Sequence, residues 1–184
     1  VKINADSDLN FLTDYTQSLS LLDFNVIVNA AKHFPNIHFE SLFSSHNAMV
    51  RAMGIRLAVM QNKTEFKLSI LRMMDDESAI VREEVYGALI AFASEIEDFE
   101  ALISHFDDMS KSLQFKLIDV MEHVDEKNLV SSFLEELILK YPMDIKIKAM
   151  SNLIKMDISF ALKYRNHENE SIGNAYKHLT DFYL

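Results

Sequence analysis

Four segments of the chain repeat one pattern of apolar residues at a near-constant step. The segments begin at Val50, Val81, Leu113 and Ile145, which are separated by 31, 32 and 32 residues. Apolar or small residues follow each start four and eight positions later, at Gly54 and Ala58, Val85 and Leu89, Leu117 and Met121, and Ala149 and Leu153. This spacing places one apolar stripe on each of four helices. A regular step of this length predicts a repeat array, whose units bury their apolar faces against their neighbours.

The composition favours helices with short connections. Apolar residues make up 49% of the chain, and only 3 glycines and 2 prolines are available to interrupt helices. No segment alternates polar and apolar residues for long enough to indicate a sheet. We therefore predict an all-α protein, folded as a single domain over residues 1–184.

The regular units occupy the middle of the chain, and less regular helices occupy its ends. We predict degenerate capping helices over residues 1–38, repeats over residues 39–156 and further capping helices over residues 157–184. Terminal units of repeat arrays are commonly atypical, which accounts for the loss of register at both ends. We expect Phe182 and Tyr183 to seal the last groove of the array.

Polar residues placed just before apolar stretches predict where helices begin, because their side chains can bond the free backbone N–H groups there. The N-terminal region has an apolar stretch from Leu9 to Leu22, followed by a predicted helix over residues 24–34 that Pro35 ends. The expected capping residues are Asp23, Asn47 and Thr64, with Asp98 or Ser112 in the third repeat.

One unit carries the signature of a known repeat family. The segment from Met74 to Leu89 has an aspartate in its turn, Asp76, and a Val-Arg pair, Val81 and Arg82, at the start of the following helix. It resembles a HEAT repeat, a unit of two antiparallel helices called A and B. The resemblance covers about residues 39–156. It implies a right-handed α-solenoid of about five antiparallel helix pairs, with a step of about 32 residues.

The signature is incomplete in the other units. Val50 and Arg51 repeat the Val-Arg opening, and Asp108 occupies the Asp position of the third unit. The departures are Gln114 and Lys146 at Arg positions, and Ser45 and Lys140 at Asp positions. These departures question whether Asp–Arg contacts run through the whole array, but they leave the helical stack intact. Armadillo-type repeats are the near alternative, although a step of about 32 residues leaves little room for their third helix.

The sequence contains no recognisable catalytic or cofactor motif. Cysteine is absent, which excludes disulfides and thiolate chemistry. The glycines fall within helical patterns, where we expect them to let helices approach closely rather than to form a phosphate loop. The seven histidines are scattered, and the acidic clusters at 75–77 and 95–100 lack the glycine of a calcium loop. We predict no cofactor, no metal site and no enzymatic activity.

The charge is unevenly distributed along the chain. The formal net charge is −10, which argues against nucleic-acid binding because such affinity comes largely from Lys and Arg. Residues 75–126 carry 15 acidic against 3 basic residues, whereas residues 140–167 carry 6 basic against 2 acidic residues. The acidic stretch is interpreted as a solvated surface, and the alternative is electrostatic steering of a basic partner.

The predicted function is a non-catalytic protein-interaction or scaffolding module, part of a larger protein. The resemblance implies that B helices line the inner wall of the array, so their non-core positions form the candidate contact surface. The partner would be a protein or another segment of the parent chain. The predicted wall consists of Arg51, Arg56, Glu83, Glu84, Tyr86, Lys116, Asp119, Glu122, Lys148, Asn152 and Lys155.

Two other functions are kept as alternatives because of the resemblance. Some HEAT-like proteins are alkylpurine DNA glycosylases, which use a basic inner wall with aromatic and acidic residues at the damaged base. This chain is acidic and has no tryptophan, which weighs against that function. A HEAT-like small-molecule lyase is the other alternative, and it rests on analogy alone.

The compartment is only loosely constrained. No uninterrupted apolar run reaches about 18 residues, so we predict no membrane insertion by this segment. The lack of cysteine favours the cytoplasm. The chain begins at Val1 without a methionine, so we expect a piece of a longer protein, and we leave open a signal or membrane anchor upstream of this segment.

Overall fold

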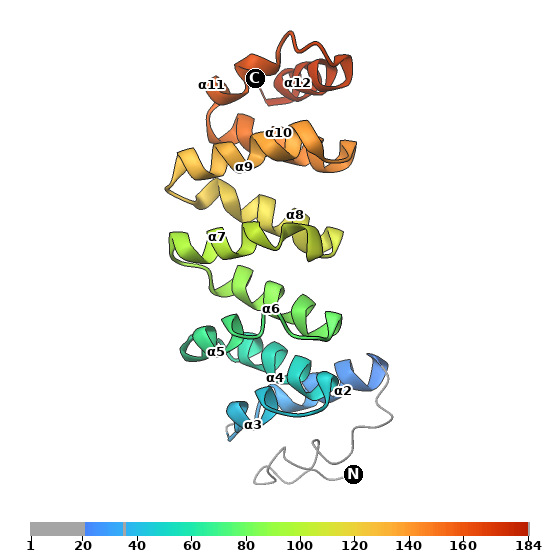
Figure 1. Cartoon of the computed structure of the whole chain (residues 1–184), viewed down its shortest axis with the longest axis vertical. Coiled ribbons are helices and arrows are strands. Elements are labelled where there is room, and N and C mark those ends of the chain that lie inside the picture. The colour runs from blue at the N-terminus through green and yellow to red at the C-terminus, as the bar shows by residue number, and fades with distance from the viewer. Residues whose placement is uncertain (1–20, 35, 184) are drawn as a thin grey trace. The chain divides into compact units, whose positions relative to one another are not determined.

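The structure is a computed structural model that describes residues 21–34 and 36–183 (Figure 1). These ranges hold eleven α-helices joined by short turns and 3₁₀ segments, and no strand occurs in them. The all-α prediction is therefore confirmed. The helices group into two compact units that divide between Ser94 and Glu95. Pro35 and the predicted apolar stretch before residue 21 lie outside the described residues.

The first unit is organised around one helix, α4, which packs against α2, α3 and α6. Helix α5 packs against α6 in turn. The helices and 3₁₀ segment of this unit are α2 (Leu21–Ala31), α3 (Phe39–Phe43), α4 (Ala48–Met60), η1 (Thr64–Phe66), α5 (Lys67–Leu71) and α6 (Ala79–Phe92). Two successive helix pairs, α3 with α4 and α5 with α6, therefore lie next to one another through α4 and α6.

The second unit has a comparable centre in α10, which packs against α8, α9, α11 and α12. Helix α10 also contacts the 3₁₀ segment η3 that follows α8. The elements of this unit are α7 (Ile96–Ser104), η2 (Phe106–Asp108), α8 (Lys111–Val120), η3 (Met121–His123), α9 (Lys127–Lys140), α10 (Met143–Met156), α11 (Ile158–Ala161), η4 (Leu162–Tyr164) and α12 (Glu170–Tyr183).

The predicted apolar stripes form the cores of both units. All positions predicted for the stripes on α4, α6, α8 with η3, and α10 are buried. Their side chains include fully buried Val50, Val85, Leu117 and Leu153. Removing a side chain of this size from water contributes about 1.5–3 kcal/mol, so the repeated stripe is the main source of cohesion between helices.

A glycine permits a close contact between two helices of the first unit. A Cβ atom placed on Gly54 in α4 would lie 2.7 Å from the Cβ of Leu42 and 3.2 Å from the Cδ1 of Phe43 in α3. Real Cβ atoms are not found at the shorter distance, so the predicted close approach is confirmed here. The same prediction is wrong for Gly173, where a Cβ would meet backbone oxygens no nearer than 3.7 Å.

The capping predictions were correct in one case and wrong in others. The Asn47 side chain accepts a hydrogen bond from the Met49 N–H at 2.8 Å, so Asn47 caps α4. Asp23 does not cap α2, because that helix begins at Leu21 and already ends at Ala31. Thr64 lies inside η1 rather than before it, since the chain starts this helix pair with a 3₁₀ turn.

The third predicted repeat uses different capping residues from those expected. Ser110 caps α8 by accepting a hydrogen bond from the Leu113 N–H, so Ser112 lies inside the helix. Asp98 is not the N-cap residue of α7, because Glu95 takes that position and Asp98 is the third residue of the helix. Its carboxylate accepts the Glu95 N–H at 3.1 Å and forms a capping box with the Glu95 side chain.

The two aromatic residues at the end of α12 behave differently. Phe182 is 80% exposed, so the expectation that it seals a groove is wrong. Tyr183 lies against α10, where its hydroxyl is 2.7 Å from the Ser151 Oγ. None of the described helices combines the length and the apolar character needed to cross a membrane.

Candidate binding surface

Three of the predicted wall residues are buried rather than exposed. Tyr86 is 1% exposed and Asn152 is 2% exposed, and Arg51 is also buried. The prediction that these three occupy non-core positions is therefore wrong. The apolar stripe is wider than the single row that the repeat spacing marked, as it is on most core-facing helices. Tyr86 and Asn152 lie next to the stripe residues Val85 and Leu153 and share their burial.

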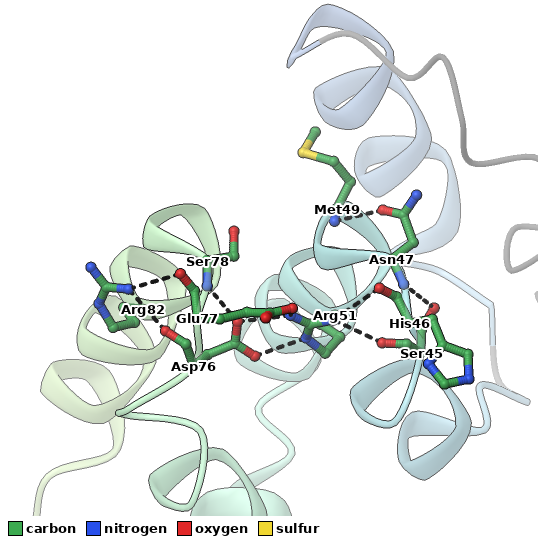
Figure 2. A network of polar contacts seen from close by, with 9 residues as sticks. All are labelled: Ser45, His46, Asn47, Met49, Arg51, Asp76, Glu77, Ser78 and Arg82. Carbon is green, nitrogen blue, oxygen red and sulfur yellow. Dashed lines mark hydrogen bonds and ion pairs between the residues drawn. The ribbon is translucent and has the colours of Figure 1, made fainter.

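Arg51 connects two turns of the first unit (Figure 2). Its Nε and Nη2 groups donate to the two carboxylate oxygens of Asp76, each at 2.8 Å. Its Nη1 group donates to the carbonyls of Ser45 at 2.9 Å and His46 at 3.3 Å. Both charged side chains are only 10% exposed. The guanidinium thus has its donors matched in a planar, two-pronged contact.

Asp76 also makes hydrogen bonds with residues that follow it in the chain. Its Oδ1 accepts the Ser78 N–H at 2.9 Å, while Arg82 Nη1 donates to the backbone carbonyls of Asp76 and Glu77 at 2.8 and 3.3 Å (Figure 2). Burial by itself raises the pKa of Asp76. The hydrogen bonds from Arg51 and Ser78, together with the charges of the two arginines, outweigh burial and lower that pKa below its ordinary value.

Arg56 joins three helices of the first unit. Its Nε donates to Glu84 Oε2 at 2.9 Å, and its Nη2 contacts the other Glu84 oxygen. Its Nη1 donates to the Asn25 Oδ1 at 2.8 Å, and the guanidinium lies 4.6 Å from the ring centroid of Phe24. Carboxylate, amide oxygen and aromatic face therefore surround one arginine, which links α4 to α6 and α2.

In the second unit, lysines rather than these arginines make contacts between neighbouring helices. Lys148 on α10 pairs with Asp119 on α8, and Lys155 Nζ lies 3.5 Å from Glu122 Oε2 on η3. The Lys155 ammonium also lies 5.9 Å from the ring centroid of Tyr183 on α12. These side chains are 30–53% exposed, far more than Arg51 and Asp76. The pairs are therefore open to water and to screening by salt.

Two buried acceptor atoms of the second unit have no hydrogen-bond donor among the described residues. They are Glu122 Oε2 and Asn152 Oδ1. Asn152 comes four residues after Lys148 and three before Lys155, so it shares their side of α10. A buried acceptor without a hydrogen bond costs about 1–3 kcal/mol, and the charge of Lys155 offsets this cost for Glu122 only.

The two remaining wall residues lie on different helices. Glu83 on α6 is half-buried, and Lys116 on α8 is exposed. The structure brings Arg56 together with Glu84, Lys148 with Asp119, and Lys155 with Glu122, which the sequence analysis did not anticipate. It does not make a continuous exposed wall of all eleven positions.

The sequence held one signal for these pairs that was missed. Complementary groups recur about one repeat step apart, as in Arg56 with Glu84 at a separation of 28 residues and Lys111 with Asp144 at 33. The Tyr141 hydroxyl donates to Asp107, 34 residues away. Burial, then the hydrogen bond to Asp107, raises the pKa of Tyr141 to about 12. Charges that alternate in sign at the repeat step indicate contacts between neighbouring pairs.

No cluster of three or more His, Asp or Glu side chains in the described ranges is arranged to hold a metal ion. We compared the chain with known protein families, with curated proteins and with solved structures, and none of the three comparisons found a match.

Proposed function

We propose that the chain is a protein-interaction module of HEAT-like helix pairs, arranged as a right-handed α-solenoid, that binds a protein partner along its B helices. The observation that carries the proposal is the row of charged side chains on these helices, beside a buried apolar stripe. In the first unit the row runs over α4 and α6, and in the second over α8 and α10. Repeat proteins commonly bind their partners through such faces on successive helices.

Contacts between successive helix pairs support the HEAT-like architecture. Helix α3 packs on α4 and α5 on α6, while α4 and α6 pack on each other. The Arg51–Asp76 contact joins the arginine of one pair to the turn aspartate of the next. These are the two positions that the family resemblance singles out.

The pairing of the basic wall residues supports a protein partner over nucleic acid. Arg51, Arg56, Lys148 and Lys155 each face a carboxylate. Cations neutralised in this way offer little to a phosphate backbone, whose binding depends on free positive charge. The proposal is therefore limited to a protein partner and includes no catalytic step.

Affinity capture with the whole chain as bait tests the proposal. Lys116→Glu reverses an exposed charge on α8 without breaking a contact that holds two helices together. It should reduce the amount of the captured partner about tenfold, a change equal to about 1.4 kcal/mol. Arg165→Glu changes the charge by the same amount at an exposed position before α12 and should leave capture unchanged. Equal capture by both variants, or no protein retained by the unmodified chain, would contradict the proposal.

A further inference from the structure

We propose that the second unit receives an arginine side chain of its protein partner between Glu122, Asn152 and Tyr183, at a place that Lys155 covers in the free protein. The inference rests on the proposed function, because it specifies the partner chemistry of the same surface. It follows from unsatisfied acceptors, from their position on α10 and from a comparison with Arg56.

Two acceptor oxygens in this region have no hydrogen bond among the described residues, and one of them, Glu122 Oε2, has only the ion pair with Lys155. Asn152 is almost completely buried, yet its Oδ1 accepts no hydrogen bond. Glu122 Oε2 is in the same condition, and its other oxygen has only His123 Nε2 at 3.7 Å. A carboxylate oxygen and an amide oxygen both accept and do not donate, so a cation with several N–H donors can bond both of them at once.

Asn152 lies on α10, and Glu122 lies on η3, which packs against α10. Lys148 and Lys155 flank Asn152 at helical spacing, and they reach Asp119 on α8 and Glu122 on η3 respectively. Asn152, between them, therefore lies at the same α10 border as Glu122. The Tyr183 ring borders this place from α12, because Lys155 lies over it.

Lys155 covers this place without satisfying it. Its Nζ is 3.5 Å from Glu122 Oε2, well beyond the 2.7–2.9 Å of a strong charge-assisted hydrogen bond. Its side chain is 42% exposed and has room to move away. Tyr183 is itself partly exposed and is fixed by its hydroxyl contact with Ser151, so the ring stays in position when the ammonium leaves.

The first unit shows which cation fits such a set of groups. Arg56 lies over the Phe24 ring and donates to the Glu84 carboxylate and to the Asn25 amide oxygen. The second unit offers the same three kinds of group in Tyr183, Glu122 and Asn152, but it holds a lysine there. A guanidinium has five N–H donors in one plane and stacks on rings, whereas an ammonium is a compact point charge. An arginine from the partner would supply the missing donors.

Fluorescence anisotropy with the whole chain tests the inference. The probe is a labelled peptide of alternating arginine and glycine, compared at physiological salt with matched lysine–glycine and glutamate–glycine peptides. We expect the arginine peptide to bind at least fivefold more tightly than the lysine peptide, and the glutamate peptide not to bind. Lys155→Met should tighten binding of the arginine peptide about fivefold, because the competing cation is gone.

Substitutions within the site and a matched control complete the test. Glu122→Gln should weaken the arginine peptide at least tenfold, and Tyr183→Leu about threefold, through loss of a charged acceptor and of a ring face. Lys177→Met removes the same charge as Lys155→Met from an exposed position on α12 and should change nothing. If the two lysine substitutions change binding equally, the change reflects net charge alone and the inference is overturned. If Glu122→Gln fails to fold, unchanged binding by Tyr183→Leu overturns it equally.

The outcome also separates this inference from the proposed function. A protein partner whose capture survives both Glu122→Gln and Tyr183→Leu would overturn the arginine site and leave the interaction module standing. Failure of the unmodified chain to capture any protein would overturn the proposed function itself.

Discussion

The two units join neighbouring helices by the same kind of contact but with different cations. In the first unit, Arg51 and Arg56 each donate hydrogen bonds to both oxygens of a carboxylate. The second uses Lys148 and Lys155, which contact one oxygen each and are more exposed. A planar guanidinium fixes distance and orientation together, whereas an ammonium fixes only distance. The charges of the first unit are therefore held in a fixed geometry, while those of the second are open to water and to screening by salt.

The largest effect is expected when the Arg51 guanidinium is removed from the first unit. Arg51→Met should lower the free energy of unfolding of the first unit by about 3 kcal/mol, because it leaves Asp76 buried and unpaired. Amide hydrogen exchange, followed residue by residue, measures each unit separately. A loss below about 1 kcal/mol would show that the guanidinium contact is not structural.

Glycine-to-alanine substitutions should act in opposite directions in the two units. Gly54→Ala forces a Cβ against Leu42 and should cost about 1–3 kcal/mol through overpacking. Gly173→Ala meets only ordinary van der Waals contacts with backbone oxygens within residues 164–167 and should stabilise the second unit by up to about 1 kcal/mol through helix propensity. Thermal unfolding of the two variants, followed by circular dichroism, checks the signs. Destabilisation of similar size in both would contradict the assigned helix approach at Gly54.

Acid should weaken the first unit through Asp76. The pKa of Asp76 is lowered in the folded protein, so its contribution to stability is fully present above the unfolded value of 3.8. That contribution is lost as the pH falls below 3.8 and through the folded-state pKa. Asp76→Asn should therefore reduce the acid dependence of hydrogen exchange in α4 and α6. An unchanged pH profile in this variant would assign the acid sensitivity to other carboxylates.

The smallest effect is expected for the lysine pair of the second unit. Lys148→Met should change the free energy of unfolding by about 0.5 kcal/mol or less, because the pair with Asp119 is exposed and screened. Urea unfolding at low and high salt measures this change. A loss as large as that of Arg51→Met would remove the distinction between the two units.

Most of the fold was predictable from local patterns. The apolar stripe on α4, α6, α8 and α10 appeared at helical spacing, and helical spacing alone determines which side chains share a face. The cap at Asn47 was predictable because one suitable residue precedes that helix. The cap of α8 was not, because Ser110 and Ser112 both suit the role and only the backbone path selects Ser110.

The candidate surface was less predictable. Its charged residues were identified on the correct helices, but Tyr86 and Asn152 lie in the core. The width of a buried stripe depends on how closely neighbouring helices approach, and a periodic pattern does not specify that distance. The partners of Arg56, Lys148 and Lys155 likewise depend on contacts between helices that lie about one repeat step apart.

The sequence by itself determined that the chain is helical and which residues line each helix core, because both follow from side-chain spacing along one element. Only the packing of separate helices brings Arg51 against Asp76 and leaves the Asn152 and Glu122 oxygens without a hydrogen bond. A hydrogen bond between separate elements forms only when the donor–acceptor distance is correct to within a few tenths of an ångström. These distances are set by how the helices pack, and the spacing of residues along one helix does not specify them.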